Sequence, residues 1–169
     1  FRCSLLGCHG ANAQAAVYYV SDSGSNFLGN GSLASPWATI SYGIGRLSGG
    51  DTLIVRPGTY TGSANFINDR MVNIPSGTSS VYTTIKAEIP YTARIRNSGA
   101  LNYYDSMVYL QRGADYIHVD GFIFDMANTT DPEYIATIES NYNKITRSIF
   151  RREGNINEYG GWVAVYGSY

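Results

Sequence analysis

The sequence has little charge, almost no cysteine and no long apolar run. Charged residues make up 15% of the 169 and the formal net charge is −1, so no basic excess exists to attract nucleic acid or an anionic membrane. Both cysteines, Cys3 and Cys8, precede residue 9, which leaves the rest of the chain without an internal disulfide. No apolar run reaches the roughly 18 residues of a membrane-spanning helix. We therefore expect no nucleic-acid partner and no transmembrane segment.

Glycine and tyrosine are abundant instead. The chain has 19 glycines and 15 tyrosines in a background of Ser, Thr and Asn. Tyr and Thr favour strands and glycine favours turns, whereas long helices need Ala, Leu, Glu and Lys. A length of 169 residues is enough for one domain with its own core. The composition predicts a single all-β domain.

The first 16 residues are typical of a targeting segment. Leu5-Leu6 forms a short apolar core, and the letters ANAQA at residues 11–15 offer the small side chains that a signal peptidase accepts. Leu5-Leu6-Gly7 before Cys8 also resembles a lipoprotein cleavage box, which would attach a lipid to Cys8. Both interpretations place the protein outside the cell or at its surface. They divide the chain into a leader, residues 1–16, and a domain, residues 17–169.

Other interpretations of this segment stay open. Cys3 and Cys8 could form a local disulfide, and with His9 they have the C-x4-C-H spacing of a variant haem attachment site. Alternatively, residues 1–16 remain in the mature protein and add a strand to a neighbouring copy. The segment would then serve assembly rather than targeting.

A short helix is expected between the first two strands, at residues 17–20 and 52–55. Ser35-Pro36 has the N-cap and first-position residues of a helix, and Gly49-Gly50 is a stop signal. A helix over residues 36–47 would place three aliphatic side chains on one face, those of Ile40, Ile44 and Leu47.

Apolar residues recur at intervals in the twenties to low thirties, with two or three short strands in each period. This spacing is typical of a β-solenoid, in which each circuit buries its apolar residues against the next circuit. Pro57-Gly58 and Gly121 would be corners between successive strands. The equivalent pairs are Ile54 and Ile85, Ile85 and Ile117, Val108 and Ala136, Leu110 and Ile138, Ile117 and Ile145, Phe124 and Phe150, and Ile138 and Val165.

The last repeat, which begins near residue 160, has only started at Tyr169. An apolar strand without a neighbour recruits a partner or aggregates. We therefore expect an uncapped end through which copies associate end to end, in contacts that need not close.

The motifs YYVSDSGS, ASPWATI and GGDTLIVRPGTYTG occur in that order, and YIHVDGFIFD follows later. Over residues 17–168 the chain resembles secreted, right-handed parallel β-helices of the pectate-lyase-like kind. The resemblance implies about five coils, an N-terminal capping helix and secretion. Enzymes of this kind cleave acidic polysaccharides by β-elimination, in which a Lys or Arg removes the C5 proton and Ca²⁺ or another Arg neutralises the uronate.

The resemblance suggests where such chemistry would lie. The candidate bases or uronate clamps are Lys144, Arg147, Arg151 and Arg152, and the candidate Ca²⁺ ligands are Asp120 and Asp125. The arginines would serve equally well as charges that protect a strand edge, and the two carboxylates as solvated turn residues. His118 is expected to be solvated. Neither a matched carboxylate set on consecutive coils nor an aligned catalytic base is present, so we expect no enzyme activity and no cofactor, with Ca²⁺ required only by a lyase.

Tyrosine is the residue type best suited to contact sugars, because it combines a flat apolar face with a polar tip. The candidate glycan contacts are Tyr103, Tyr104, Tyr109, Tyr116 and Tyr142, and Asn30 and Asn128 begin N-glycosylation triplets. Three functions are left: a secreted structural module that associates through its ends, a fragment of a uronate-cleaving lyase, and an adhesin that binds glycans without cleaving them.

Overall fold

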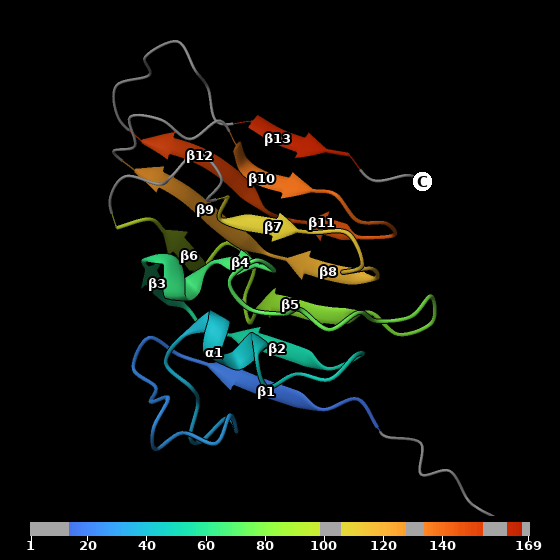
Figure 1. Ribbon diagram of the computed structural model, residues 1–169. Coiled ribbons are helices and arrows are strands. Elements are labelled where there is room, and N and C mark those ends of the chain that lie inside the picture. Colours follow the sequence, from blue (N-terminus) through green and yellow to red (C-terminus); the bar gives the residue numbers. More distant parts are fainter. Residues whose placement is uncertain (1–13, 99–105, 128–133, 154–161, 167–169) are drawn as a thin grey trace, which may run out of the picture.

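The computed structural model describes residues 14–98, 106–127, 134–153 and 162–166. In this part of the chain, 13 strands form three parallel sheets and helix is nearly absent (Figure 1). The predicted all-β class is confirmed. Residues 1–13, with Cys3, Cys8 and His9, lie outside the described residues, so the interpretations of that segment stay predictions.

The bounds of the strands are as follows. The first sheet contains β1 (Val17–Val20), β2 (Thr52–Val55), β5 (Thr83–Ala87), β8 (Ile117–Asp120) and β11 (Lys144–Thr146). The second sheet contains β3 (Gly58–Thr61), β6 (Ala93–Arg96), β9 (Phe122–Ala127) and β12 (Ile149–Glu153). The third sheet contains β4 (Ile67–Asn68), β7 (Val108–Leu110), β10 (Tyr134–Ile138) and β13 (Trp162–Val165).

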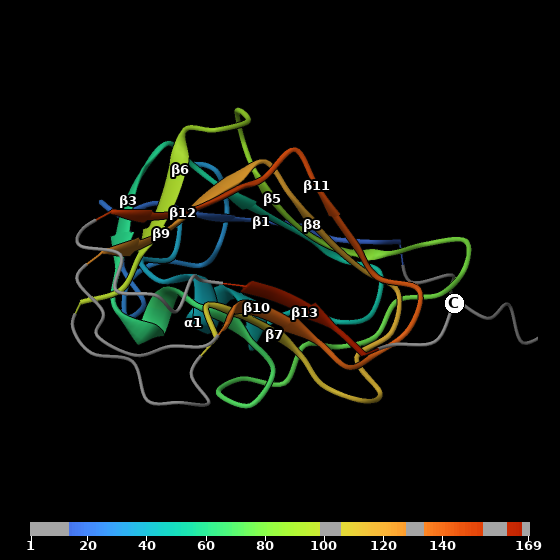
Figure 2. The same ribbon diagram turned by 90° about the horizontal axis from the view of Figure 1, so that it is seen from above.

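The chain visits the three sheets in a fixed order. From β2 onward, each strand of the first sheet is followed by one of the second and one of the third, and each pairs in parallel with its equivalent one circuit later. Seen along the stack of strands, the sheets are three sides around a common core (Figure 2). This arrangement is compatible with a parallel β-helix.

The predicted stacking of Leu110, Ile138 and Val165 is confirmed. Ile138 pairs with Leu110 on one side and with Val165 on the other. Leu110 is fully buried, whereas Val165 is 53% exposed because β13 is the last strand of its sheet. The predicted pairs Val108–Ala136 and Phe124–Phe150 are also in register.

Three other predicted pairs in the first sheet are wrong. Ile145 pairs with Val119 rather than Ile117, and Val119 also pairs with Ile85. The partner of Ile85 in β2 is Leu53, not Ile54. Loops of different length change the period from circuit to circuit. The shift between Ile117 and Val119 is two residues and keeps the same face inward, so the apolar pattern alone could not detect it. The shift between Ile54 and Leu53 is one residue and changes the face, because all of residues 53–55 are aliphatic and the pattern does not show which of them point inward.

The corner predicted at Gly121 is confirmed, and the corner predicted at Pro57-Gly58 lies one residue earlier. β2 ends at Val55 and β3 begins at Gly58, so Arg56-Pro57 makes the turn. Gly121 is the single residue between β8 and β9 and has φ +85°, a conformation that favours glycine. These short corners join the first sheet to the second.

The helix is shorter than predicted. α1 covers Ile40–Ile44, with Thr39 as its N-cap and Gly45 as its C-cap. Trp37 instead lies beside Val20 in a parallel bridge, and its backbone bonds to Tyr19 and Ser21. This strand-like pairing takes the place of the helix start that Ser35-Pro36 predicted. Ile40 and Ile44 point into the core as expected.

Side chains from distant positions complete the start of α1. The Asn26 Oδ1 accepts the N–H groups of Ala38 and Thr39 at 2.8 and 3.2 Å, and the Asn65 Oδ1 accepts that of Ile40 at 3.2 Å. Because these donors have no partner within the helix, the two asparagines replace a local cap. Within the described residues, no helix is long and apolar enough to cross a membrane.

Candidate functional site

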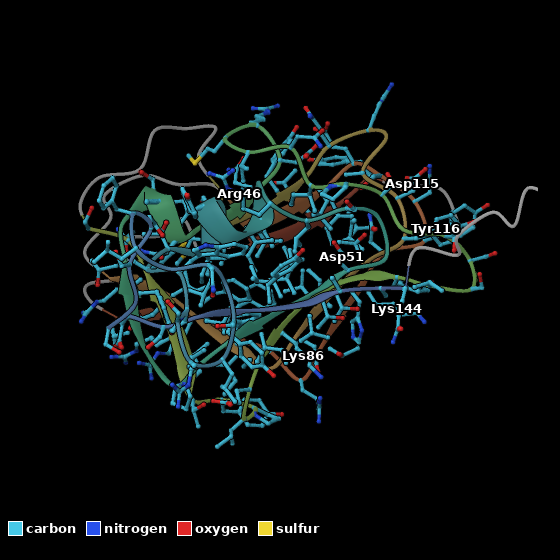
Figure 3. All side chains as sticks on the ribbon, turned by 90° about the horizontal axis from the view of Figure 1, so that it is seen from below. Arg46, Asp51, Lys86, Asp115, Tyr116 and Lys144 are labelled. Carbon is cyan, nitrogen blue, oxygen red and sulfur yellow. The ribbon has the colours of Figure 1, made fainter. Side chains whose placement is uncertain are left out.

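A cluster of aromatic and cationic side chains covers the outer face of the first sheet at β5, β8 and β11. Side chains alternate along these strands, so Ile85 and Val119 point into the core while His118 and Lys144 point outward. Lys86 and Lys144 lie on this outer side, Tyr116 lies at the end of the sheet where β8 begins, and Arg46 lies across the core from Lys86 (Figure 3). We call the cluster the tyrosine–lysine face; its residues are Tyr82, Tyr116, His118, Asp120, Tyr142, Lys144, Thr146 and Arg147.

Three tyrosines occupy the same position in consecutive circuits. Tyr82, Tyr116 and Tyr142 each stand directly before the stretch that enters the first sheet. The rings of Tyr116 and Tyr142 stack with centroids 4.8 Å apart and an interplanar angle of 7°. Tyr82 meets Tyr116 edge to face at 5.8 Å. The tyrosines therefore form a continuous column, and Tyr142, 56% exposed, is its most open member.

The column is built on strained backbone. Tyr116 and Tyr142 have φ values of +57° and +56°, in the left-handed region that side-chain-bearing residues seldom adopt. The Asn143 side chain helps to hold this conformation, since its Oδ1 accepts the Ile117 N–H at 2.7 Å and its Nδ2 donates to Ala114. Non-glycine residues in such conformations occur most often at functional sites. The strain therefore directs attention to the column.

Lys144 brings a positive charge onto the column. Its Nζ lies 4.2 Å from the centroid of the Tyr82 ring, within the range of a cation–π interaction. Lys144 is on β11 and Tyr82 precedes β5, so the side chain spans the intervening strand β8. The ammonium group is thus held over an aromatic surface on the outside of the sheet.

A chain of hydrogen bonds runs beside the column from His118 to Arg147. The Thr146 hydroxyl donates to the Asp120 Oδ1 at 2.7 Å, and its oxygen lies 2.7 Å from the His118 Nε2. Since the hydroxyl proton points to Asp120, the neutral imidazole carries its proton on Nε2 and leaves Nδ1 as an acceptor. Arg147 donates hydrogen bonds to both oxygens of Asp120, from Nε to Oδ1 at 2.9 Å and from Nη2 to Oδ2.

These contacts shift the pKa values of the chain. Hydrogen bonds from Arg147 lower the pKa of Asp120, against burial, and the same carboxylate raises the pKa of Arg147. Burial lowers the pKa of His118; Asp120 opposes this shift, while Lys144, Arg147 and Lys86 add to it. At neutral pH Asp120 is therefore ionised, Arg147 is protonated, and His118 is neutral.

The candidate Ca²⁺ ligands Asp120 and Asp125 lie on different sheets, and each is paired with arginine. Asp120 is bound by Arg147, whereas Asp125 lies on the second sheet with Arg94, Arg96 and Arg151 within 3.0–3.9 Å of its Oδ2. Both carboxylates are buried, so the alternative prediction that they are solvated is wrong. The part of the chain that the structure describes contains no group of three or more His, Cys, Asp or Glu side chains able to hold a metal ion.

The candidate bases and clamps thus lie in different places. Lys144 and Arg147 belong to the tyrosine–lysine face, whereas Arg151 belongs to the cluster around Asp125 on the second sheet. Arg152 lies on β12, and its side chain is outside the described residues.

The tyrosine candidates also separate. Tyr116 and Tyr142 are in the column, but Tyr109 lies on β7 of the third sheet and is 3% exposed. The Arg70 guanidinium covers that ring at 4.1 Å and donates to its hydroxyl at 2.6 Å, while burial raises the pKa of Tyr109. Tyr109 therefore offers no face to a sugar. Tyr103 and Tyr104 lie outside the described residues, as does Asn128; Asn30 is exposed.

Three members of the face were missed by sequence reasoning. The circuit from Tyr82 to Tyr116 is longer than the circuit from Tyr116 to Tyr142, so a constant spacing did not reveal that the three positions are equivalent. His118 is half-buried and hydrogen-bonded, which corrects the prediction that it is solvated. Thr146 has no sequence signal, because its role depends on two neighbours from β8.

Comparison of the chain with family models, with curated proteins and with solved structures gives no match.

Proposed function

We propose that this chain is a secreted or cell-surface, right-handed parallel β-helix of the pectate-lyase-like kind, with α1 as part of its N-terminal cap. We further propose that it binds an anionic polysaccharide on the tyrosine–lysine face. The observation that carries the binding proposal is the tyrosine column with Lys144 and Arg147 beside it. Tyrosine offers an apolar surface to the carbon face of a sugar ring, and the cations offer charge to its carboxylate or sulfate groups.

The charge distribution supports this choice of ligand. The formal net charge is −1, yet the described side chains of the first two sheets and their corners contribute seven cations and three carboxylates. A local excess of one sign attracts a polymer of the opposite sign. The cations are Arg56, Lys86, Arg94, Arg96, Lys144, Arg147 and Arg151; the carboxylates are Glu88, Asp120 and Asp125.

Arg147 is suited to clamp an anion rather than to remove a proton. Its pKa is raised by Asp120, so it stays protonated, and its side chain is 58% exposed while still held by that carboxylate. A fixed guanidinium presents remaining N–H donors in a plane that matches a carboxylate. Binding without cleavage therefore agrees with the geometry of this residue.

Titration calorimetry with polygalacturonate tests the proposal. Lys144→Gln and Tyr142→Ala should each weaken binding at least about fivefold, which corresponds to about 1 kcal/mol. Arg46→Gln is the matched control, because it removes one charge from a residue across the core from this face. A neutral glucan should not bind, and added salt should weaken binding of the charged polymer. Equal loss for Arg46→Gln and Lys144→Gln would contradict a localised site.

A polysaccharide lyase is the second candidate, because Lys144 and Arg147 occupy one face. In this proposal Lys144 takes the C5 proton, Arg147 neutralises the uronate carboxylate, the C4–O bond breaks as the C4=C5 double bond forms, and water protonates the leaving oxygen. Incubation with polygalacturonate or alginate and Ca²⁺ would then increase the ultraviolet absorbance of unsaturated products. If the absorbance does not increase with any of several uronates, the lyase candidate is rejected and only the binding proposal is left.

A further inference from the structure

Three arginines surround a buried carboxylate on the outer face of the second sheet. Side chains alternate along β6, β9 and β12, so the neighbours of the buried Ile95 and Phe124 point outward. The second sheet forms a different side of the molecule from the first sheet, which carries the tyrosine–lysine face (Figure 2). We call this group the arginine cluster; its residues are Arg94 and Arg96 on β6, Asp125 on β9 and Arg151 on β12.

The carboxylate of the cluster lies beneath the guanidinium groups. The Asp125 side chain is fully buried, whereas the side chains of the three arginines are 29–35% exposed. All three approach the same oxygen, Oδ2, with nitrogen–oxygen distances of 3.0 Å for Arg94, 3.9 Å for Arg96 and 3.2 Å for Arg151. The cluster therefore presents cations to solvent, although a carboxylate lies at its centre.

The parallel ladder fixes where these side chains stand. Arg96 pairs with Asp125, and Asp125 pairs with Arg151, so the three residues form one row across the sheet. Thr61 continues the row on β3, where it pairs with Arg96 and adds an exposed hydroxyl. Because the strands and Asp125 already restrict the arginines, a ligand that contacts them costs less side-chain entropy.

The cluster contains arginine and no lysine. The lysines of the chain, Lys86 and Lys144, both lie on the first sheet. Arginine is more weakly hydrated than lysine, and its planar fork of N–H donors matches the oxygens of a carboxylate or a phosphate. The composition of the cluster thus favours recognition of an oxyanion by geometry as well as by charge.

The charge of the cluster distinguishes between these two oxyanions. Its described side chains carry three positive charges and one negative charge. A phosphate monoester has three acceptor oxygens and a charge of about −1.5 to −2 at pH 7. It can therefore offer one oxygen to each arginine and balance the remaining charge. A single carboxylate has fewer oxygens and half that charge, so it matches the cluster less well.

We propose that the arginine cluster binds a phosphate group, as inorganic phosphate or as the monoester of a small molecule. The phosphate lies over Asp125 and accepts hydrogen bonds from the three guanidinium groups. This site is separate from the tyrosine–lysine face, and the inference does not depend on polysaccharide binding.

Titration with inorganic phosphate, followed by NMR of the arginine Nε–H groups, tests the proposal. The signals of Arg94, Arg96 and Arg151 should shift together and saturate, whereas sodium chloride at the same ionic strength should shift them little. Glucose 6-phosphate separates the two sources of the group. Tighter binding than that of phosphate would assign the site to an ester, and equal binding would assign it to free phosphate; both results support the proposal.

Arginine-to-lysine variants separate the fork from the charge. Arg94→Lys keeps the positive charge but loses the planar donors, so its affinity for phosphate should fall at least about fivefold. Arg96→Lys should behave in the same way and is the milder change, because Arg96 is the most distant of the three from Oδ2. Arg46→Lys is the matched control, since Arg46 follows α1 and contacts Tyr42, and it should bind phosphate as wild type does.

Two results would overturn the proposal. One is a shift of the arginine signals by chloride as large as the shift by phosphate. The other is equal phosphate affinity of Arg96→Lys and Arg46→Lys, which would make the cluster a purely structural network of ion pairs. Neither result bears on polygalacturonate binding, which is tested with Lys144→Gln and Tyr142→Ala on the other sheet.

Discussion

Replacing Tyr142 with alanine and, separately, with glycine measures the strain in the tyrosine column. Both substitutions remove the ring that stacks on Tyr116 at 4.8 Å, an interaction worth about 0.5–1.5 kcal/mol. Only glycine also relieves the backbone, since φ +56° costs a residue with a Cβ about 1–2 kcal/mol. The glycine variant avoids this cost, but its unfolded chain has more conformational freedom than that of the alanine variant. This difference offsets about 0.5–1 kcal/mol of the stability that relief of the strain provides.

The glycine variant should therefore be as stable as the alanine variant or more stable, by up to about 1.5 kcal/mol. At most sites in regular structure glycine is the less stable of the two, so the order itself is informative. Urea denaturation of wild type and both variants measures the differences in the free energy of unfolding. Calorimetry with polygalacturonate should show that both variants bind weakly, because neither has the ring. An alanine variant more stable than the glycine variant by about 1 kcal/mol would refute the argument that the backbone is strained.

The contacts of other residues give further predictions. Because the pKa of Asp120 is lowered on folding, this carboxylate stabilises the protein above its ordinary pKa of 3.8, and that contribution is lost as the pH falls through the folded value. Asp120→Asn should therefore flatten the decrease of the urea midpoint at acidic pH, and an unchanged acid profile would contradict the Arg147 contact. The pKa of His118 is lowered from 6.5, so His118→Gln should reduce the loss of stability below about pH 6.5. Phe124 is fully buried and stacks on Phe150 at 4.9 Å, so Phe124→Ala should destabilise by about 3–5 kcal/mol, measured by urea denaturation against the outward-facing control Ile123→Ala.

The candidate site was only partly predictable. Arg147 was found from sequence because it begins the densest cationic stretch, residues 147–155; Lys144 was found as a cation just before that stretch, and Tyr116 and Tyr142 because tyrosine is abundant. That stretch also supplied Arg151, which the structure places on another sheet with Asp125. Arg147 lies in the corner between β11 and β12, whereas Arg151 lies on β12. The density of charge along the chain does not show where a corner falls, so it cannot tell which of these side chains share a face.

The sequence by itself determined the class of the fold. Alternating short strands, glycine corners and stacked aliphatic residues such as Leu110 and Ile138 repeat along the chain, and only parallel stacking buries them all. These signals are local, so they survive without knowledge of the rest of the molecule. The corners near Pro57-Gly58 and at Gly121 were found for the same reason.

Tertiary structure alone decided register, helix bounds and the site. Loops of unequal length set which residue of one circuit lies on which residue of the next, and that pairing joined Tyr82 to Tyr116 and Ile145 to Val119. Trp37 left the expected helix because its backbone bonds to β1, 16 or more positions earlier in the chain. Each of these outcomes is a competition between a local preference and a contact distant in sequence, and the distant contact won because it satisfies buried hydrogen bonds and apolar surface together.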